Sequence, residues 1–198
     1  MRLLLATRNQ HKLREFRALL APHDLAPLPH NVALPPETGA TFEQNALDKA
    51  RAAAAATGMT AIADDSGIEA AALGGRPGVR SARYAGEDAS DAENLAKLLA
   101  EVGAAEAADA DGDRRVAYVC ALAYAEPEGR EHVVTARCEG ELAHQPRGSG
   151  GFGYDPAFVP VDSDDGRTMA ELSVEEKHAI SHRGRAARAF LDWLGENV

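Results

Sequence analysis

The sequence predicts a mixed α/β protein in which strands and helices surround a central antiparallel element. Alternate positions of one extended run hold Val116, Tyr118, Cys120, Leu122 and Tyr124, and after a turn at 126–129 a second extended run follows at 132–139, which indicates a long antiparallel hairpin. Elsewhere apolar residues recur about every three to four positions, as on one face of a helix. Because a hairpin lies within the chain, a purely parallel, doubly wound sheet is not expected.

The first half of the chain predicts a strand, a helix, a loop and a longer helix. Five prolines between 22 and 36 indicate a loop. Thr41 and Gln44 have the spacing of a capping box, and Gly58 is a typical helix stop. The expected elements are a buried strand at 2–6, a helix at 10–20 with Leu13, Phe16 and Leu20 inward, at most one short strand at 25–28, a helix from 41 to 58, and a short strand at 60–64 that ends at an acidic pair.

Two further capping boxes divide the second half. Ser90 with Glu93 begins one helix, and Ser173 with Glu176 begins another. The expected elements are extended structure at 68–73, a helix from 90 to 102, a polar linker at 104–113, the two hairpin strands, a glycine-rich loop at 145–154, a short helix from 173, and a last helix from 181 with Ala186, Phe190, Trp193 and Leu194 along one side.

Composition limits the class of protein. A chain of 198 residues can form one domain over 1–198 with a core that needs no disulfides. Cys120 and Cys138 lack metal-ligand spacing, so we expect buried free thiols and a reducing, cytoplasmic location. No apolar run suits a signal peptide or a membrane span. The net charge of −10 argues against a general nucleic-acid surface, although a local basic cluster could bind a small anion.

Two segments of the N-terminal part have the chemistry of a phosphate and metal site. Residues 7–12 lie where a strand turns into a helix, so backbone amides, the positive end of the helix dipole and Lys12 could bind an anion. The segment 64–67 offers two carboxylates, a hydroxyl and a glycine, and with Glu37 or Glu69 it could hold Mg²⁺ and accept a proton from water. The alternatives are an ordinary helix cap and an Asx-type turn.

Two segments of the C-terminal part could bind a ligand, the first of them a flat ring. In the run 148–155, Phe152 and Tyr154 lie among glycines, as in a stacking platform, with Asp155 available for hydrogen bonds. The alternative is that these aromatics pack the loop onto the core. In the run 176–183, basic side chains at the start of a helix oppose its dipole, which is unfavourable without an anion or acceptor. The alternative is a solvated basic patch.

Seven motifs in order resemble the inosine triphosphate pyrophosphatase family, also called noncanonical purine NTP pyrophosphatases or dITP/XTP pyrophosphatases. They extend over nearly the whole chain, from residue 3 to about 190. They are Thr7-x-Asn9-x-x-Lys12, Glu37-Thr38-Gly39, Phe42-x-x-Asn45-Ala46, Asp64-Asp65-Ser66-Gly67, Pro77-Gly78-Val79-x-Ser81-Ala82-Arg83-Tyr84-Ala85-Gly86, Gly150-Gly151-Phe152-Gly153-Tyr154-Asp155-Pro156 and Glu176-Lys177-x-x-Ile180-Ser181-His182-Arg183-Gly184.

The resemblance implies an elongated, two-lobed α/β fold around a long mixed sheet flanked by helices, and a homodimer. It also implies Mg²⁺-dependent hydrolysis of ITP, dITP or XTP to the monophosphate and pyrophosphate, with Asp65 as the proton acceptor and Lys12 offsetting charge on the phosphates. The implied metal ligands are Glu37 and Asp65. The implied substrate contacts are Thr7, Arg8, Asn9, Gln10, His11 and Lys12 for the phosphates, Ser66, then Phe152, Gly153, Tyr154 and Asp155 for the base, and Lys177, His182 and Arg183 for the base and its edge.

Two positions depart from the family pattern. His178 stands where Asn is usual, and Arg8 where Gly or another small or basic residue is common. Two other functions are left open: a pyrophosphatase for other modified nucleotides, such as pyrimidine triphosphates, and a regulatory module that binds purine nucleotide without hydrolysing it.

Overall fold

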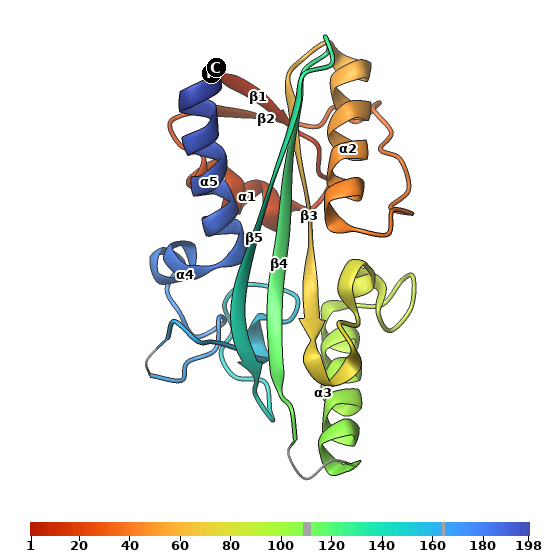
Figure 1. Cartoon of the computed structure of the whole chain (residues 1–198), viewed down its shortest axis with the longest axis vertical. Helices are drawn as coiled ribbons and strands as arrows, with labels where there is room; N and C mark the ends of the chain where they lie inside the picture. Colours follow the sequence, from red (N-terminus) through yellow and green to blue (C-terminus); the bar gives the residue numbers. More distant parts are fainter. Residues whose placement is uncertain (109–111, 164) are drawn as a thin grey trace. The chain divides into compact units, whose positions relative to one another are not determined.

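The computed structural model describes residues 1–108, 112–163 and 165–198. Within these residues the fold is mixed α/β, with a six-stranded sheet in the order β2-β1-β3-β4-β5-β6 (Figure 1). The strands are β1 (Arg2–Leu5), β2 (Asp24–Pro27), β3 (Ala61–Ala70), β4 (Arg115–Ala125), β5 (Glu131–Leu142) and β6 (Phe158–Pro160). The helices are α1 (Gln10–Leu19), α2 (Phe42–Thr57), α3 (Asp91–Ala108), α4 (Val174–Ile180) and α5 (His182–Asn197), with 3₁₀ turns at Ala71–Leu73, Gly78–Arg83 and Asp155–Ala157.

The sheet combines parallel and antiparallel pairs. β1 pairs in parallel with β2 on one side and with β3 on the other. β4 and β5 are neighbours in the sheet, and a hydrogen bond from Glu126 N to Arg130 O (2.8 Å) closes the turn that joins them. Strands joined so tightly run antiparallel, which confirms the predicted hairpin. β6 pairs antiparallel with the end of β5.

The chain divides into two compact units. Unit 1 comprises residues 1–65, 120–136 and 183–198, and unit 2 comprises residues 66–119 and 137–182. Neither is a continuous stretch of chain, and β3, β4 and β5 contribute residues to both. That residues 1–198 form a single domain stays a prediction.

Each unit has its own apolar core, and each core contains one of the two free cysteines, as predicted. In unit 1, α1 and α5 cover one face of the sheet and the alanine-rich α2 covers the other (Figure 1). The core of unit 1 contains Leu3, Leu5, Leu13, Phe16, Leu20, Ile62, Cys120, Leu122, Tyr124, Ala186, Phe190 and Leu194. The core of unit 2 contains Ile68, Leu95, Leu98, Val102, Val116, Tyr118, Cys138, Tyr154, Phe158 and Met169.

The predicted helix starts are confirmed. Thr41 caps α2 by accepting from Gln44 N, and Gly58 ends that helix in the left-handed conformation at φ 65°. Ser173 and Glu176 form a reciprocal capping box on α4. A cap satisfies backbone N–H groups that a helix leaves unpaired, so it marks the start of a helix independently of tertiary packing.

Two predicted boundaries are wrong. The strand expected to end at Asp64 continues as β3 to Ala70, because β3 is a central strand with β1 and β4 as its neighbours. The polar linker expected at 104–113 is helical as far as Ala108, where α3 ends. Residues 109–111 of that expected linker lie outside the described residues.

Candidate active site

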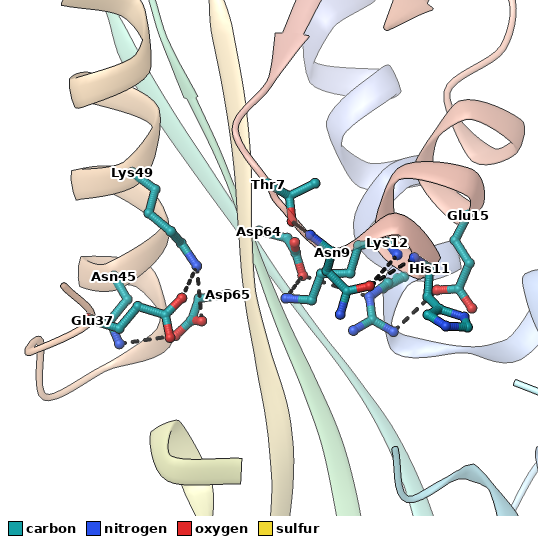
Figure 2. Close-up of polar contacts among 11 residues, drawn as sticks. Thr7, Asn9, His11, Lys12, Glu15, Glu37, Asn45, Lys49, Asp64 and Asp65 are labelled. Atoms are coloured by element: carbon teal, nitrogen blue, oxygen red, sulfur yellow. Dashed lines mark hydrogen bonds and ion pairs between the residues drawn. The ribbon is translucent and has the colours of Figure 1, made fainter. Parts of the chain in front are cut away.

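Asp64 and Asp65 extend from opposite faces of β3 (Figure 2). Successive side chains of a strand alternate between its two faces, so one acidic pair supplies two separate clusters. Asp64 contacts Lys12 and Arg183, and Asp65 contacts Asn45 and Lys49. Both carboxylates are buried, and their surroundings shift their pKa values in opposite directions.

Gly67 does not form the turn that the sequence suggested. It continues β3, and a Cβ atom at this position would overlap Ser81 Oγ and lie 2.6 Å from Gly78 O. Glycine is therefore required here for the close approach of the segment at 78–81. Ser66, the predicted substrate contact, is half-buried on the same strand.

The Asp65 cluster joins two carboxylates through one cation. Lys49 Nζ donates to Glu37 Oε1 (2.5 Å) and to Asp65 Oδ1 (3.2 Å), and Asn45 Nδ2 donates to Asp65 Oδ2 (3.0 Å; Figure 2). Asn45 and Lys49 lie four residues apart on α2, so they share one helix face. The motifs contain Asn45 without a role for it, and Lys49 was not predicted. The signal for both is a pair of polar residues at helical spacing on an otherwise apolar, alanine-rich face.

The charges of this cluster oppose one another. Burial raises the pKa of Asp65, and the nearby Glu37 carboxylate raises it further, while Lys49 acts in the opposite direction. Burial alone would lower the pKa of Lys49, but the surrounding carboxylates raise it. Asp65 therefore holds a proton more readily than an ordinary aspartate does, which is the property expected of a general base.

The donor set of this cluster suits Mg²⁺ that also binds substrate phosphates. Among residues 1–108, 112–163 and 165–198, no three His, Cys, Asp or Glu side chains gather as a ready metal site. Mg²⁺ is often held by one or two carboxylates together with substrate phosphates and water. Glu37 and Asp65 already share the ammonium of Lys49, so this carboxylate pair fits a bound cation.

The Asp64 cluster is a buried ion network. Asp64 Oδ2 lies 2.8 Å from Lys12 Nζ and 3.7 Å from Arg183 Nε, and Arg183 Nη1 donates to Glu15 (3.2 Å). Burial would raise the pKa of Asp64, but Lys12, Arg183 and Lys49 together lower it to about 2. Asp64 is therefore a permanent anion at neutral pH, suited to holding Lys12 in place rather than to accepting a proton.

We expect Asp64 to stabilise the metal-free fold above about pH 4. A folded-state pKa of about 2, below the ordinary 3.8, contributes stability that is present above pH 3.8 and is lost as the pH falls towards 2. The shift corresponds to about 2 kcal/mol. The measurement is the free energy of unfolding between pH 2 and pH 7 in chelator. Asp64→Asn should be less stable than wild type at pH 7 and lose less stability between pH 4 and pH 2. Parallel profiles would contradict the assignment.

In the turn at 7–12 a side chain caps the start of α1. Asn9 caps α1, and its Oδ1 accepts from His11 N (2.8 Å) and from Lys12 N (3.2 Å), while Asn9 N donates to Thr7 Oγ1 (3.2 Å; Figure 2). Two first-turn amides are thus engaged by the cap. Gln10 and His11 are exposed at the start of α1.

In unit 2, three donors converge on Asp155. Its carboxylate accepts from Tyr118 Oη (3.1 Å), from Phe152 N (2.8 Å) and from Lys177 Nζ (2.8 Å). Gly151, at φ 68°, allows this, because a Cβ atom there would overlap Asp155 Oδ2. Lys177 Nζ also lies 5.2 Å from the centre of the Phe152 ring.

The two aromatics of the glycine-rich loop have different surroundings. Phe152 is half-buried, whereas Tyr154 is buried in the core of unit 2 and its hydroxyl donates to Ser81 O (2.7 Å). For Tyr154 the structure therefore favours the alternative that it packs the loop onto the core. Gly153 N donates to Asp91 Oδ2 (2.8 Å), which further ties the loop to α3.

His182 and Arg183 are adjacent in sequence but belong to different clusters. The His182 ring stacks on Tyr118, with centroids 4.4 Å apart and planes at 18°. Arg183 contacts Asp64 and Glu15 in unit 1. The structure therefore groups His182 with Lys177 and Asp155 around Tyr118, and it groups Arg183 with Lys12. The base-edge role of His182 and Arg183 stays a prediction.

Comparison with known proteins decides the family. Residues 3–193 match the model described as the Ham1 family. The chain belongs to the Ham1 family. It is 50% identical to the dITP/XTP pyrophosphatase of Symbiobacterium thermophilum over 196 residues, covering 98% of this chain and 94% of that protein. It is 50% identical to the dITP/XTP pyrophosphatase of Streptomyces coelicolor over 201 residues, covering 98% of each.

A solved Ham1 structure shares the fold. The HAM1 protein from Coxiella burnetii aligns with a TM-score of 0.88 at 42% identity and covers 99% of each chain. The family resemblance expected from the seven motifs is thus confirmed. None of the helices in the described part of the chain is both long enough and apolar enough to cross a membrane.

Proposed function

We propose that this Ham1 family member hydrolyses noncanonical purine nucleoside triphosphates, ITP, dITP and XTP, to the monophosphate and pyrophosphate. The observation that carries the proposal is that Asp64 and Asp65 lie on opposite faces of β3 and contact different side chains. Asp65, with a raised pKa, lies beside Glu37 and Lys49, whereas Asp64 anchors Lys12. The curated relatives named dITP/XTP pyrophosphatases support the substrate class.

We assign Asp65 as the general base that accepts the proton of the attacking water. The water oxygen forms a bond to the α-phosphorus, the bond from that phosphorus to the bridging oxygen breaks, and pyrophosphate leaves with the electron pair. The proton of the water passes to Asp65 Oδ, and Lys49 and Asn45 fix the direction of that carboxylate. Lys12 is placed by Asp64 to offset charge on the phosphates.

Glu37 and Asp65 are the side chains we assign to Mg²⁺. When bound, the ion would supply positive charge to the phosphate oxygens. For the base, we assign the Phe152 ring to stacking and Lys177, positioned by Asp155, to the polar edge of the ring. The homodimer and the cytoplasmic location stay predictions.

The decisive test identifies which phosphate bond of the substrate is broken. With ITP and Mg²⁺ we expect pyrophosphate and IMP in equal amounts, measured by phosphorus NMR, with no IDP. Orthophosphate with accumulating IDP would rule out attack at the α-phosphorus. Modified pyrimidine triphosphates in the same panel test the alternative substrate class, and nucleotide bound without turnover would indicate a regulatory module.

A further inference from the structure

Arg8 extends from the turn at 7–12 to the backbone of another segment of unit 1. Its Nη1 donates to Leu28 O (3.1 Å), and its Nη2 contacts three further carbonyl oxygens, those of Pro29 (2.9 Å), His30 (3.3 Å) and Val32 (2.7 Å). A guanidinium carries five N–H donors in a fixed fork, and these two terminal nitrogens carry four of them. The side chain is therefore directed to this loop rather than to a phosphate.

The loop forms few backbone hydrogen bonds of its own. Residues 28–40 lie outside helices and strands, and the prolines at 29, 35 and 36 have no N–H group. The backbone hydrogen bonds found within the segment are Val32 N to Pro29 O (3.1 Å) and Thr38 N to Pro36 O (3.0 Å). Buried carbonyl groups that no strand pairs need other donors, and Arg8 donates to those of the buried residues Leu28 and Val32.

Glu37 lies between two fixed points of this segment. On its N-terminal side the backbone up to Val32 is bound by Arg8. On its C-terminal side, Gly39 N donates to Asn45 Oδ1 (2.8 Å) and Ala40 N donates to Gln44 Oε1 (3.2 Å), both on α2. The Glu37 carboxylate itself contacts Lys49.

We propose that Arg8 is a positioning residue for Glu37. By fixing the start of the 32–39 segment, Arg8 holds the Glu37 carboxylate beside Asp65, and it makes no phosphate contact of its own. The inference rests on the proposed role of Glu37 as a metal ligand. This proposal differs from the expectation that Arg8 contacts the phosphates.

The test compares Arg8→Ala and Arg8→Lys with the matched control Arg17→Ala. Arg17 also lies on the surface of unit 1 and also donates to a backbone carbonyl, that of Leu25, but it does not contact the 28–32 loop. In metal-free protein we expect Arg8→Ala to speed hydrogen exchange of amides 32–39 and to leave those of β1 and α1 unchanged. Calorimetry with Mg²⁺ or Mn²⁺ alone should show an affinity about 10-fold lower, a usual cost of removing an outer-shell partner.

Kinetics separate positioning from phosphate binding. At saturating Mg²⁺ we expect the KM of Arg8→Ala for ITP to stay near the wild-type value, Arg8→Lys to recover part of the metal affinity, and Arg17→Ala to match wild type throughout. A raised KM with unchanged exchange would assign Arg8 to the phosphates and overturn the proposal. So would unchanged metal affinity, or faster exchange throughout β1 and α1 in both Arg8 variants. Absence of ITP hydrolysis in wild type would instead reject the proposed function, and the exchange and calorimetry would still decide the role of Arg8.

Discussion

Asp65→Asn should lower kcat by a factor on the order of 10²–10⁴ and leave the fold intact. The substitution removes the proton acceptor and a metal-binding oxygen, and loss of a general base typically costs this much. The side-chain oxygen of the new Asn can still accept from Asn45. Burial and Glu37 raise the pKa of Asp65, so the substitution removes a disfavoured charge, but its amide nitrogen faces Lys49 Nζ; the Tm of the metal-free variant should therefore fall less than that of Asp64→Asn. Single-turnover kinetics with ITP and a thermal melt in chelator provide the two measurements.

Asp64→Asn is the matched control, one residue away on the opposite face of β3. It leaves Lys12 and Arg183 with their carboxylate partner neutralised in a buried site, so its Tm should fall clearly. Because Asp64 holds Lys12, Asp64→Asn should also lower activity, but its main effect should be on Tm, whereas the main effect of Asp65→Asn should be on kcat. Equal activity of Asp65→Asn and wild type, or a lower Tm for Asp65→Asn than for Asp64→Asn, would contradict the assignment.

Local patterns in the sequence were sufficient to predict most helices and strands of the fold. The caps at Thr41 and Ser173 mark helix starts, and the alternation from Val116 to Tyr124 marks a strand, because each depends on neighbouring residues only. The break expected after Asp64 was wrong for a nonlocal reason. A glycine beside two aspartates resembles a turn, but β3 has neighbouring strands on both sides, and Gly67 accommodates the segment at 78–81.

The sequence indicates which residues are candidates for the site, but few of the contacts between them. Alternation along a strand is enough to separate Asp64 from Asp65, and the structure confirms that they face opposite ways. The contact of Lys49 with both Glu37 and Asp65 could not be predicted, since it depends on how α2 packs on the sheet. The same holds for Arg183, whose partner Glu15 is 168 positions away in sequence.

Lys177 and Arg183 have different surroundings, and this affects which of them we expect to distinguish one purine base from another. Hypoxanthine and xanthine carry a 6-oxo acceptor, whereas adenine carries an amino donor at that position and would leave a protein donor unpaired. Both cations are ion-paired, Arg183 with Asp64 and Glu15 and Lys177 with Asp155, but only Lys177 is found beside the Phe152 ring that we assign to stacking on the base. We therefore expect Lys177, rather than Arg183, to distinguish ITP from ATP.

Lys177→Met should lower the ratio of kcat/KM for ITP to that for ATP by roughly 5- to 150-fold, because an unpaired buried polar group costs about 1–3 kcal/mol. Arg183→Ala should lower kcat/KM for both nucleotides by similar factors and keep the ratio. Since Lys177→Met leaves the buried Asp155 carboxylate without its cation, the double variant Lys177→Met/Asp155→Asn, which restores neutrality, provides the measurement if the single variant does not fold. If Arg183→Ala abolishes the preference for ITP while the Lys177 variants retain it, Arg183 contacts the base edge and the assignment made from the contacts of unit 2 is wrong.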